Sequence, residues 1–167
     1  LFPDPYDTYT DWVGILEARM TNDFSFLKNN ILSSSSLTSD KYGGGTPIGA
    51  AVRDGAHYLY ANHRKHDSHG NKVKMLMVVM SDGYANKPEN DPDQYAIAMA
   101  NYAESLGIEI HTISLGDDAD VALMTAIANA TGGKQFSATG SGSELTRTLK
   151  QAYRNIAGTI NRTVLVQ

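Results

Sequence analysis

Apolar and polar residues alternate along the chain in blocks that are typical of strands and helices. Val73–Met80 and Ile108–Leu115 are apolar runs of strand length, as expected for strands buried on both faces of a parallel sheet. Apolar residues recur at helical spacing in four other segments, which are residues 48–59, 93–106, 121–130 and 143–156. A shorter strand is predicted at Gln135–Ala138. This alternation predicts an α/β protein built from βαβ units, with a mostly parallel sheet flanked by helices.

The two ends of the chain carry weaker patterns. Residues 1–10 are predicted to be an irregular lead-in, Trp12–Leu16 a short strand and Asp23–Ile31 a short helix. The serine run that follows has the composition of a linker. Residues 158–167 are expected to be a tail or a closing strand, with Thr163–Val166 as the strand.

Composition narrows the classes of function. The 167 residues favour one domain, spanning 1–167. The net charge of −4 and the lack of a basic cluster argue against nucleic acid as a partner. The absence of cysteine excludes disulfide scaffolds, zinc ribbons and cysteine nucleophiles.

Polar residues follow the two main predicted strands. Ser81 and Asp82 come after the first, and Asp117 and Asp118 come after the second. Ligands of parallel α/β sheets bind beyond the carboxyl ends of the strands. We therefore expect these side chains to lie at one edge of the sheet.

A glycine-rich segment at residues 43–49, Gly-Gly-Gly-Thr-Pro-Ile-Gly, precedes the first long helix. Thr46 is predicted to be its N-cap and Pro47 its first residue. Three interpretations stay open: a phosphate cradle, with only Lys41 as a nearby cation, a flexible approach to a capped helix, or part of a metal site. In the last case the Thr46 hydroxyl and the Asp82 carboxylate are hard oxygen ligands that suit Mg²⁺, Mn²⁺ or Ca²⁺.

Several segments, in order, resemble the von Willebrand factor type A (VWA) domain. The glycine-rich segment resembles the second metal loop of that family, and residues 77–83, Met-Val-Val-Met-Ser-Asp-Gly, resemble its central strand and third metal loop. The resemblance covers residues 11–157 and continues through these segments: residues 20–28, 103–108, 110–116, 127–134 and 143–145. It is specific because six weak motifs occur in the right order.

The resemblance implies a Rossmann-like sheet wrapped by helices, with a metal-ion-dependent adhesion site at its top. Thr46 and Asp82 would be ligands of the ion, and Ser81, Asp117 and Asp118 are candidates for supporting those ligands without touching the ion. The family's first strand and its Asp-x-Ser-x-Ser loop have no counterpart before Thr46, and Asp23–Leu27 matches that loop only halfway. We therefore expect an incomplete domain, which binds a cation only if the missing loop is supplied from elsewhere.

Other polar clusters have simpler explanations. His63, His66, Asp67 and His69 are expected to form a solvated loop rather than a transition-metal site. Asp117, Asp118 and Asp120 are expected to stabilise the N-terminus of the next helix. The serines of residues 139–143 are expected to cap the last helix, and no Gly-x-Ser-x-Gly turn marks a nucleophile.

These observations lead to a binding domain rather than an enzyme. The resemblance implies a protein partner that offers an acidic side chain, a place outside the cytoplasm or on the cell surface, and membrane attachment through segments beyond this chain. The last helix and the residues after it also resemble, more loosely, bacterial surface and pilus-assembly proteins that carry this domain. Two alternatives are a structural subunit completed by a neighbouring chain through strand addition and a phosphate- or nucleotide-binding enzyme.

Overall fold

The computed structural model describes residues 13–33 and 45–164. The elements follow in this order: α1 (Phe24–Phe26), the π-helix η1 (Leu27–Ile31), α2 (Ile48–Asn62), β1 (Met75–Ser81), α3 (Pro92–Ser105), β2 (Ile108–Leu115), α4 (Val121–Ala130), β3 (Gln135–Ala138) and α5 (Gly142–Val164). The predicted α/β class is therefore confirmed. The predicted bounds of β2, α4 and β3 agree with the structure at both ends.

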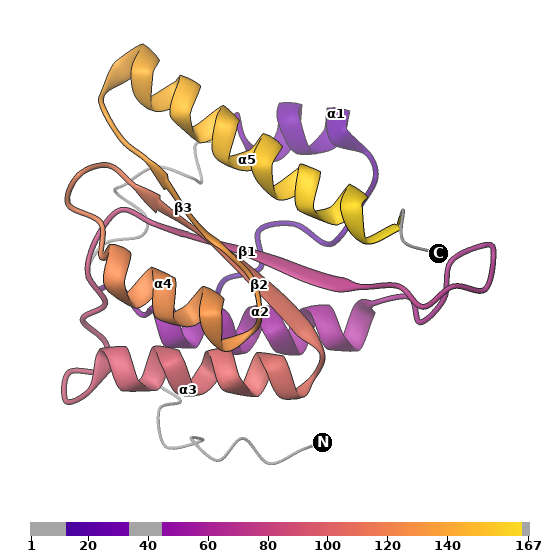
Figure 1. The fold of residues 1–167 in the computed structure, drawn as a ribbon, viewed down its shortest axis with the longest axis horizontal. Coiled ribbons are helices and arrows are strands. Elements are labelled where there is room, and N and C mark those ends of the chain that lie inside the picture. Colours follow the sequence, from indigo (N-terminus) through magenta and orange to yellow (C-terminus); the bar gives the residue numbers. More distant parts are fainter. Residues whose placement is uncertain (1–12, 34–44, 165–167) are drawn as a thin grey trace.

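The three strands form a parallel sheet in the order β1-β2-β3. Met75 pairs with Ile108 at the start of the β1–β2 ladder, and Thr112 pairs with Gln135 at the start of the β2–β3 ladder. Helices α2, α3 and α4 cover one face of the sheet, and α5 covers the other (Figure 1). Because all strands run the same way, the loops that follow them meet at one edge.

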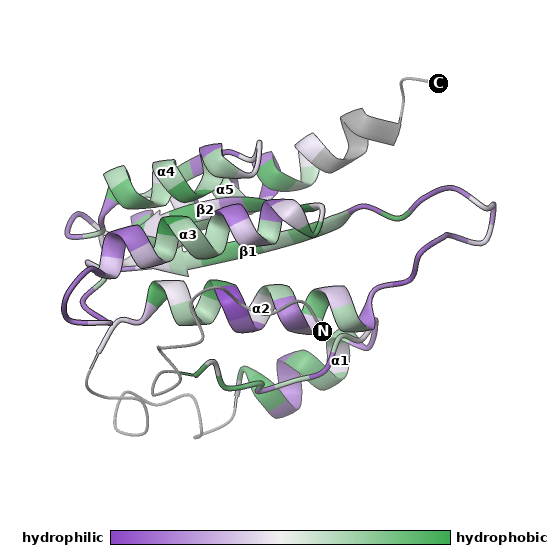
Figure 2. Cartoon of the chain, turned by 90° about the horizontal axis from the view of Figure 1, so that it is seen from below, coloured by the Kyte–Doolittle hydropathy of each residue, from purple (hydrophilic) through white to green (hydrophobic). Residues whose placement is uncertain are grey.

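The core has two parts, one on each face of the sheet. The larger part lies under α2, α3 and α4 and includes Met99, Ile110 and Met124, while the smaller lies under α5 around Ile113 and Ile156. Strand β2 is buried on both faces, which explains its nearly continuous apolar sequence. The predominantly hydrophobic strands and the polar outer faces of the helices are visible in Figure 2.

Helices α2 and α3 approach each other closely at Gly49. A Cβ atom at this position would lie 2.4 Å from Cδ1 of Tyr95, which is itself buried. The Tyr95 hydroxyl accepts a hydrogen bond from the Arg53 guanidinium at 3.0 Å. Gly49 thus serves helix packing, which removes one glycine from the predicted phosphate cradle, while Lys41, Gly43 and Gly44 lie outside the described residues.

The segment before α2 differs from its predicted structure. Residues 13–16 do not form a strand: the Gly14 N–H donates to the Asp54 carboxylate of α2, so this segment is held by a side chain instead of a ladder. Trp12 lies outside the described residues. The predicted helix at Asp23–Ile31 is present, but its second half is π-helical and none of its residues is buried. Phe24, one of its apolar residues, is 76% exposed, so this helix does not bury Phe24 in the core.

Two predicted helix boundaries are also wrong. Pro47, not Thr46, is the N-cap of α2, and it makes no side-chain capping bond. The predicted closing strand at Thr163–Val166 is wrong in its first half, because α5 continues to Val164 and the remaining residues lie outside the described part. An existing helix gains one hydrogen bond for each added residue, and here this outweighs the β-propensity of Thr and Val, which depends strongly on context.

Candidate functional site

The candidate site lies where β1 and β2 end and α2 begins. The loop after β1 holds the segment before α2 through Asn86: the Thr46 N–H donates to Asn86 Oδ1 at 2.7 Å, and the Asn86 N–H donates to the Thr46 carbonyl at 3.2 Å. Gly45 packs directly on the same loop, since a Cβ there would lie 2.8 Å from Cγ of Lys87. The structure therefore brings Thr46 to the loop that carries Asp82.

The side chains of Thr46 and Asp82 are available to a ligand. Thr46 is half-buried and Asp82 is exposed. Within the described residues, neither the Thr46 hydroxyl nor the Asp82 carboxylate makes a hydrogen bond or an ion pair. These two groups thus stabilise nothing that the structure describes, whereas Asn86, which sequence reasoning missed, fixes the local backbone. An Asn five residues after a strand carries no motif that marks this role.

Ser81 has a structural task in the turn after β1. Its hydroxyl donates to the Gly83 carbonyl at 3.2 Å, and the Gly83 N–H approaches its Oγ at 3.4 Å. Ser81 therefore shapes the loop that presents Asp82, and its oxygen is already engaged.

The aspartates after β2 divide into two groups. Asp120 is the N-cap of α4: it is buried, and its Oδ1 accepts a hydrogen bond from the Leu123 N–H at 2.9 Å. Its predicted role at the helix N-terminus is confirmed. Asp117 and Asp118 are exposed and make no such cap, so they stay candidates for supporting a cation.

Negative charge gathers at this edge of the sheet. Burial raises the pKa of Asp93, at the start of α3, and the charges of Asp120 and Asp91 raise it further. The charges of Asp91 and Asp120 therefore lie close enough to the start of α3 to act on Asp93.

The described residues do not complete a metal site. Across residues 13–33 and 45–164, no three acidic or histidine side chains come close enough to hold a metal ion. A divalent cation of the hard type needs about six oxygen ligands. Thr46 and Asp82 would supply two of these, so a site of full strength would require further protein ligands.

The histidine-containing loop is exposed, as predicted. Asp67 closes a turn there by accepting hydrogen bonds from the His69 and Asn71 N–H groups at 2.8 and 2.9 Å. His66 and Lys72 form an isolated bridge across the same loop. The predicted serine cap of the last helix is wrong, because Ser143 lies inside α5 and the Glu144 N–H donates to the backbone carbonyl of Ser141 at 3.1 Å.

A family comparison decides the class of domain. The model of the von Willebrand factor type A domain matches residues 17–152, which is most of the chain. The chain belongs to the VWA family. VWA domains are generally protein–protein interaction domains and are typically not enzymes. The match includes the α2, β1 and β2 segments that build the candidate site, as the sequence resemblance predicts.

Part of the VWA chain also matches part of a solved structure. An uncharacterized membrane-spanning protein from Vibrio fischeri aligns with 23% identity and a TM-score of 0.43, covering 55% of this chain and 49% of that one. The match thus spans about half the length of that protein. No curated protein matches significantly. None of the described helices is both long and apolar enough to cross a membrane.

Proposed function

We propose that this VWA domain binds a protein partner through the edge of the sheet that carries Thr46 and Asp82. The proposal places the domain outside the cytoplasm or on the cell surface, as the family resemblance suggests. The partner would offer an acidic side chain, and a hard cation such as Mg²⁺ would bind only when a further loop supplies the remaining ligands.

One observation carries the proposal. Asn86 holds Thr46 to the loop that carries Asp82, yet the Thr46 hydroxyl and the Asp82 carboxylate are left without a partner among the described residues. Polar side chains just past the ends of parallel strands serve ligands more often than packing.

The first test is metal binding by the full-length protein. Asp82→Asn should weaken Mn²⁺ binding at least about tenfold in calorimetric titration, because one of few charged ligands is lost. Without metal its melting temperature should stay within about 2 °C, since an exposed, unbonded carboxylate contributes little to stability. Glu104→Gln removes the same charge from the exposed end of α3 and is the matched control.

A second pair of variants tests whether the hydroxyl oxygen of Thr46, rather than the size and shape of its side chain, is needed for metal binding. Thr46→Val should weaken Mn²⁺ binding, and Thr46→Ser should retain it, because only serine keeps an oxygen ligand. Surface plasmon resonance against an immobilised glutamate-rich peptide should show an increase in signal on addition of Mn²⁺, and this increase should be absent in Asp82→Asn. Unchanged binding in Asp82→Asn, or unfolding of that variant, would contradict the proposal.

A structural subunit completed by strand addition is the second candidate. Met80 of β1 is 47% exposed, although it belongs to an apolar run. Within the described sheet, β1 has a neighbour on one side only, so its other edge offers unpaired N–H and C=O groups. An extended segment of a neighbouring chain could pair there.

A further inference from the structure

A second potential binding region lies at the opposite edge of the sheet, where the strands begin. A cavity of about 580 Å³ opens there between the sheet and the second half of α5. Its wall contains residues from four segments, which include Lys74, Glu109, His111, Lys134, Phe136 and Arg154. This volume lies in the range of small-molecule and short-peptide sites.

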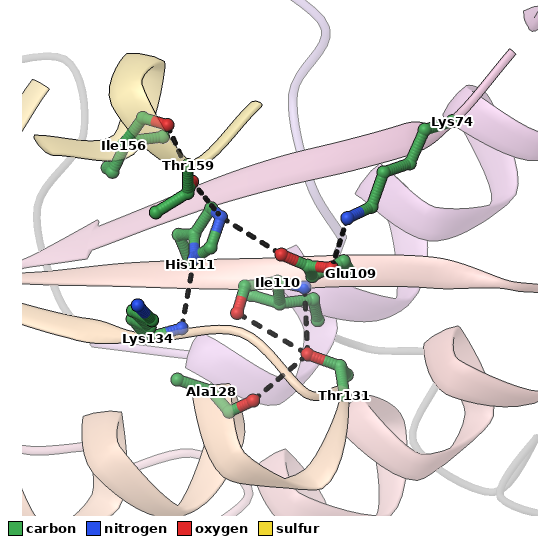
Figure 3. Close-up of polar contacts among 9 residues, drawn as sticks. All are labelled: Lys74, Glu109, Ile110, His111, Ala128, Thr131, Lys134, Ile156 and Thr159. Carbon is green, nitrogen blue, oxygen red and sulfur yellow. Dashed lines mark hydrogen bonds and ion pairs between the residues drawn. The ribbon is translucent and has the colours of Figure 1, made fainter. Parts of the chain in front are cut away.

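A hydrogen-bond network around His111 builds one wall of the cavity (Figure 3). The His111 ring is buried, with 1% exposure, and its Nδ1 accepts the Lys134 N–H at 2.9 Å. The proton of the neutral ring therefore sits on Nε2, which lies 3.1 Å from Glu109 Oε1 and 3.3 Å from Thr159 Oγ1. Glu109 also pairs with Lys74 through its other oxygen. Because the buried ring is satisfied on both nitrogens, this wall is formed before any ligand arrives.

Gly133 fixes the position of Lys134. A Cβ atom at Gly133 would lie only 1.9 Å from the Ile110 carbonyl oxygen, so the chain reaches β2 this closely only with glycine. Thr131 supports the same approach, since its Oγ1 accepts the Ile110 N–H at 2.8 Å. The backbone before Lys134 is therefore held against β2 by Gly133 and Thr131. The side chain of Lys134 is exposed and lines the cavity.

The cavity carries excess positive charge in an acidic chain. Lys74, Lys134 and Arg154 line it, against the single carboxylate of Glu109, whereas the chain as a whole has a net charge of −4. Lys74 is neutralised by Glu109. Among the described residues, the side chains of Lys134 and Arg154 make no ion pair. Two cations are thus left at one cavity without an anion.

We propose that this cavity binds a carboxylate-bearing ligand, which is either a free dicarboxylic acid or the acidic side chains of a peptide. The planar guanidinium of Arg154 suits bidentate binding of a carboxylate, and Lys134 adds a point charge. The Phe136 ring offers apolar surface to the carbon chain of the ligand. A phosphate is less well served, because no helix N-terminus or glycine-rich turn is among the cavity's described lining residues. This site goes beyond the proposed function: it needs no metal and lies at the other edge of the sheet.

The test uses the full-length protein in EDTA, with succinate, a tetraglutamate peptide and the corresponding tetraglutamine peptide as probes. Calorimetry should show saturable binding of succinate, of tetraglutamate, or of both, but not of tetraglutamine. Arg154→Gln and Lys134→Gln should each weaken that binding about tenfold through the loss of charge-assisted hydrogen bonds. Both side chains are exposed, so the variants should keep their melting temperatures.

Arg147→Gln is the matched control, because it removes a cation from an exposed position on the same helix. It should leave binding unchanged. Binding of succinate alone identifies a free acid as the ligand, and binding of tetraglutamate alone identifies a peptide. The proposal is wrong if neither probe binds, if tetraglutamine binds equally, if phosphate binds more tightly than both carboxylates, or if Arg147→Gln weakens binding as much as Arg154→Gln. These results are independent of Asp82→Asn, so failure here leaves the proposed function standing.

Discussion

Replacing Gly133 by alanine should destabilise the protein more than most single substitutions. The new Cβ would lie 1.9 Å from the Ile110 oxygen and 2.6 Å from its carbonyl carbon. Both are backbone atoms of a buried strand and cannot rotate away, so the two segments must separate by roughly 1 Å. That shift acts on two bonds of Lys134: its N–H to His111 at 2.9 Å and its carbonyl to the Thr112 N–H at 3.0 Å.

The expected cost follows from these two effects. Overpacking a core typically costs about 1–3 kcal/mol, and each weakened hydrogen bond adds about 1 kcal/mol. We therefore expect Gly133→Ala to lower the free energy of unfolding by about 3–5 kcal/mol, measured by urea denaturation. The melting temperature should fall by about 10 °C.

Gly83→Ala is the control, because nothing lies within 4 Å of its Cβ position and its φ is not positive. It should change stability by less than about 0.5 kcal/mol. A loss below about 1 kcal/mol in Gly133→Ala, with the control unchanged, would refute the argument that close approach to Ile110 requires glycine.

Two further predictions concern pH and the open strand edge. Burial lowers the pKa of His111 in the folded protein, despite the opposing charge of Glu109. An unfolded histidine has a pKa of about 6.5. As pH falls, the unfolded state therefore binds a proton on His111 before the folded state does. The contribution of His111 to stability is therefore fully present above about pH 6.5 and is lost as pH falls toward the folded pKa. The free energy of unfolding, measured by urea titration, should thus fall more between pH 7.5 and 5.5 in the native protein than in His111→Gln. Equal pH dependence in the two proteins would contradict this. If the free edge of β1 pairs with a second copy, Met80→Lys should reduce self-association in analytical ultracentrifugation, because a charge on an edge strand opposes pairing; a native protein that stays monomeric at high concentration would show that the edge does not pair.

The sequence predicts some of these features well because they are local. The bounds of β2 and α4 follow from unbroken periodicity between clear turn signals. The approach of Thr46 to the loop after β1 follows from the parallel sheet, whose strands end at one edge, whereas the role of Thr46 and Asp82 as ligands stays a prediction. The cavity near His111 was not predicted, since its lining converges from four segments only through strand register. One signal was present: Glu109 and His111 lie two residues apart in a buried strand, so they share a face on which polar groups need partners.

The asymmetric covering of the sheet has a consequence for how the molecule opens. Strand β2 has a ladder on each side and helices on both faces, whereas β1 is half-exposed along most of its length and α5 packs mainly on β2 and β3. Amide hydrogens of β2 should therefore exchange with solvent only on global unfolding, and those near the end of β1 through smaller local openings. The loop with Asp82 directly follows this less protected strand. A ligand that binds there would suppress those openings, so slower exchange in β1 would report occupancy of the site even when the partner itself is invisible.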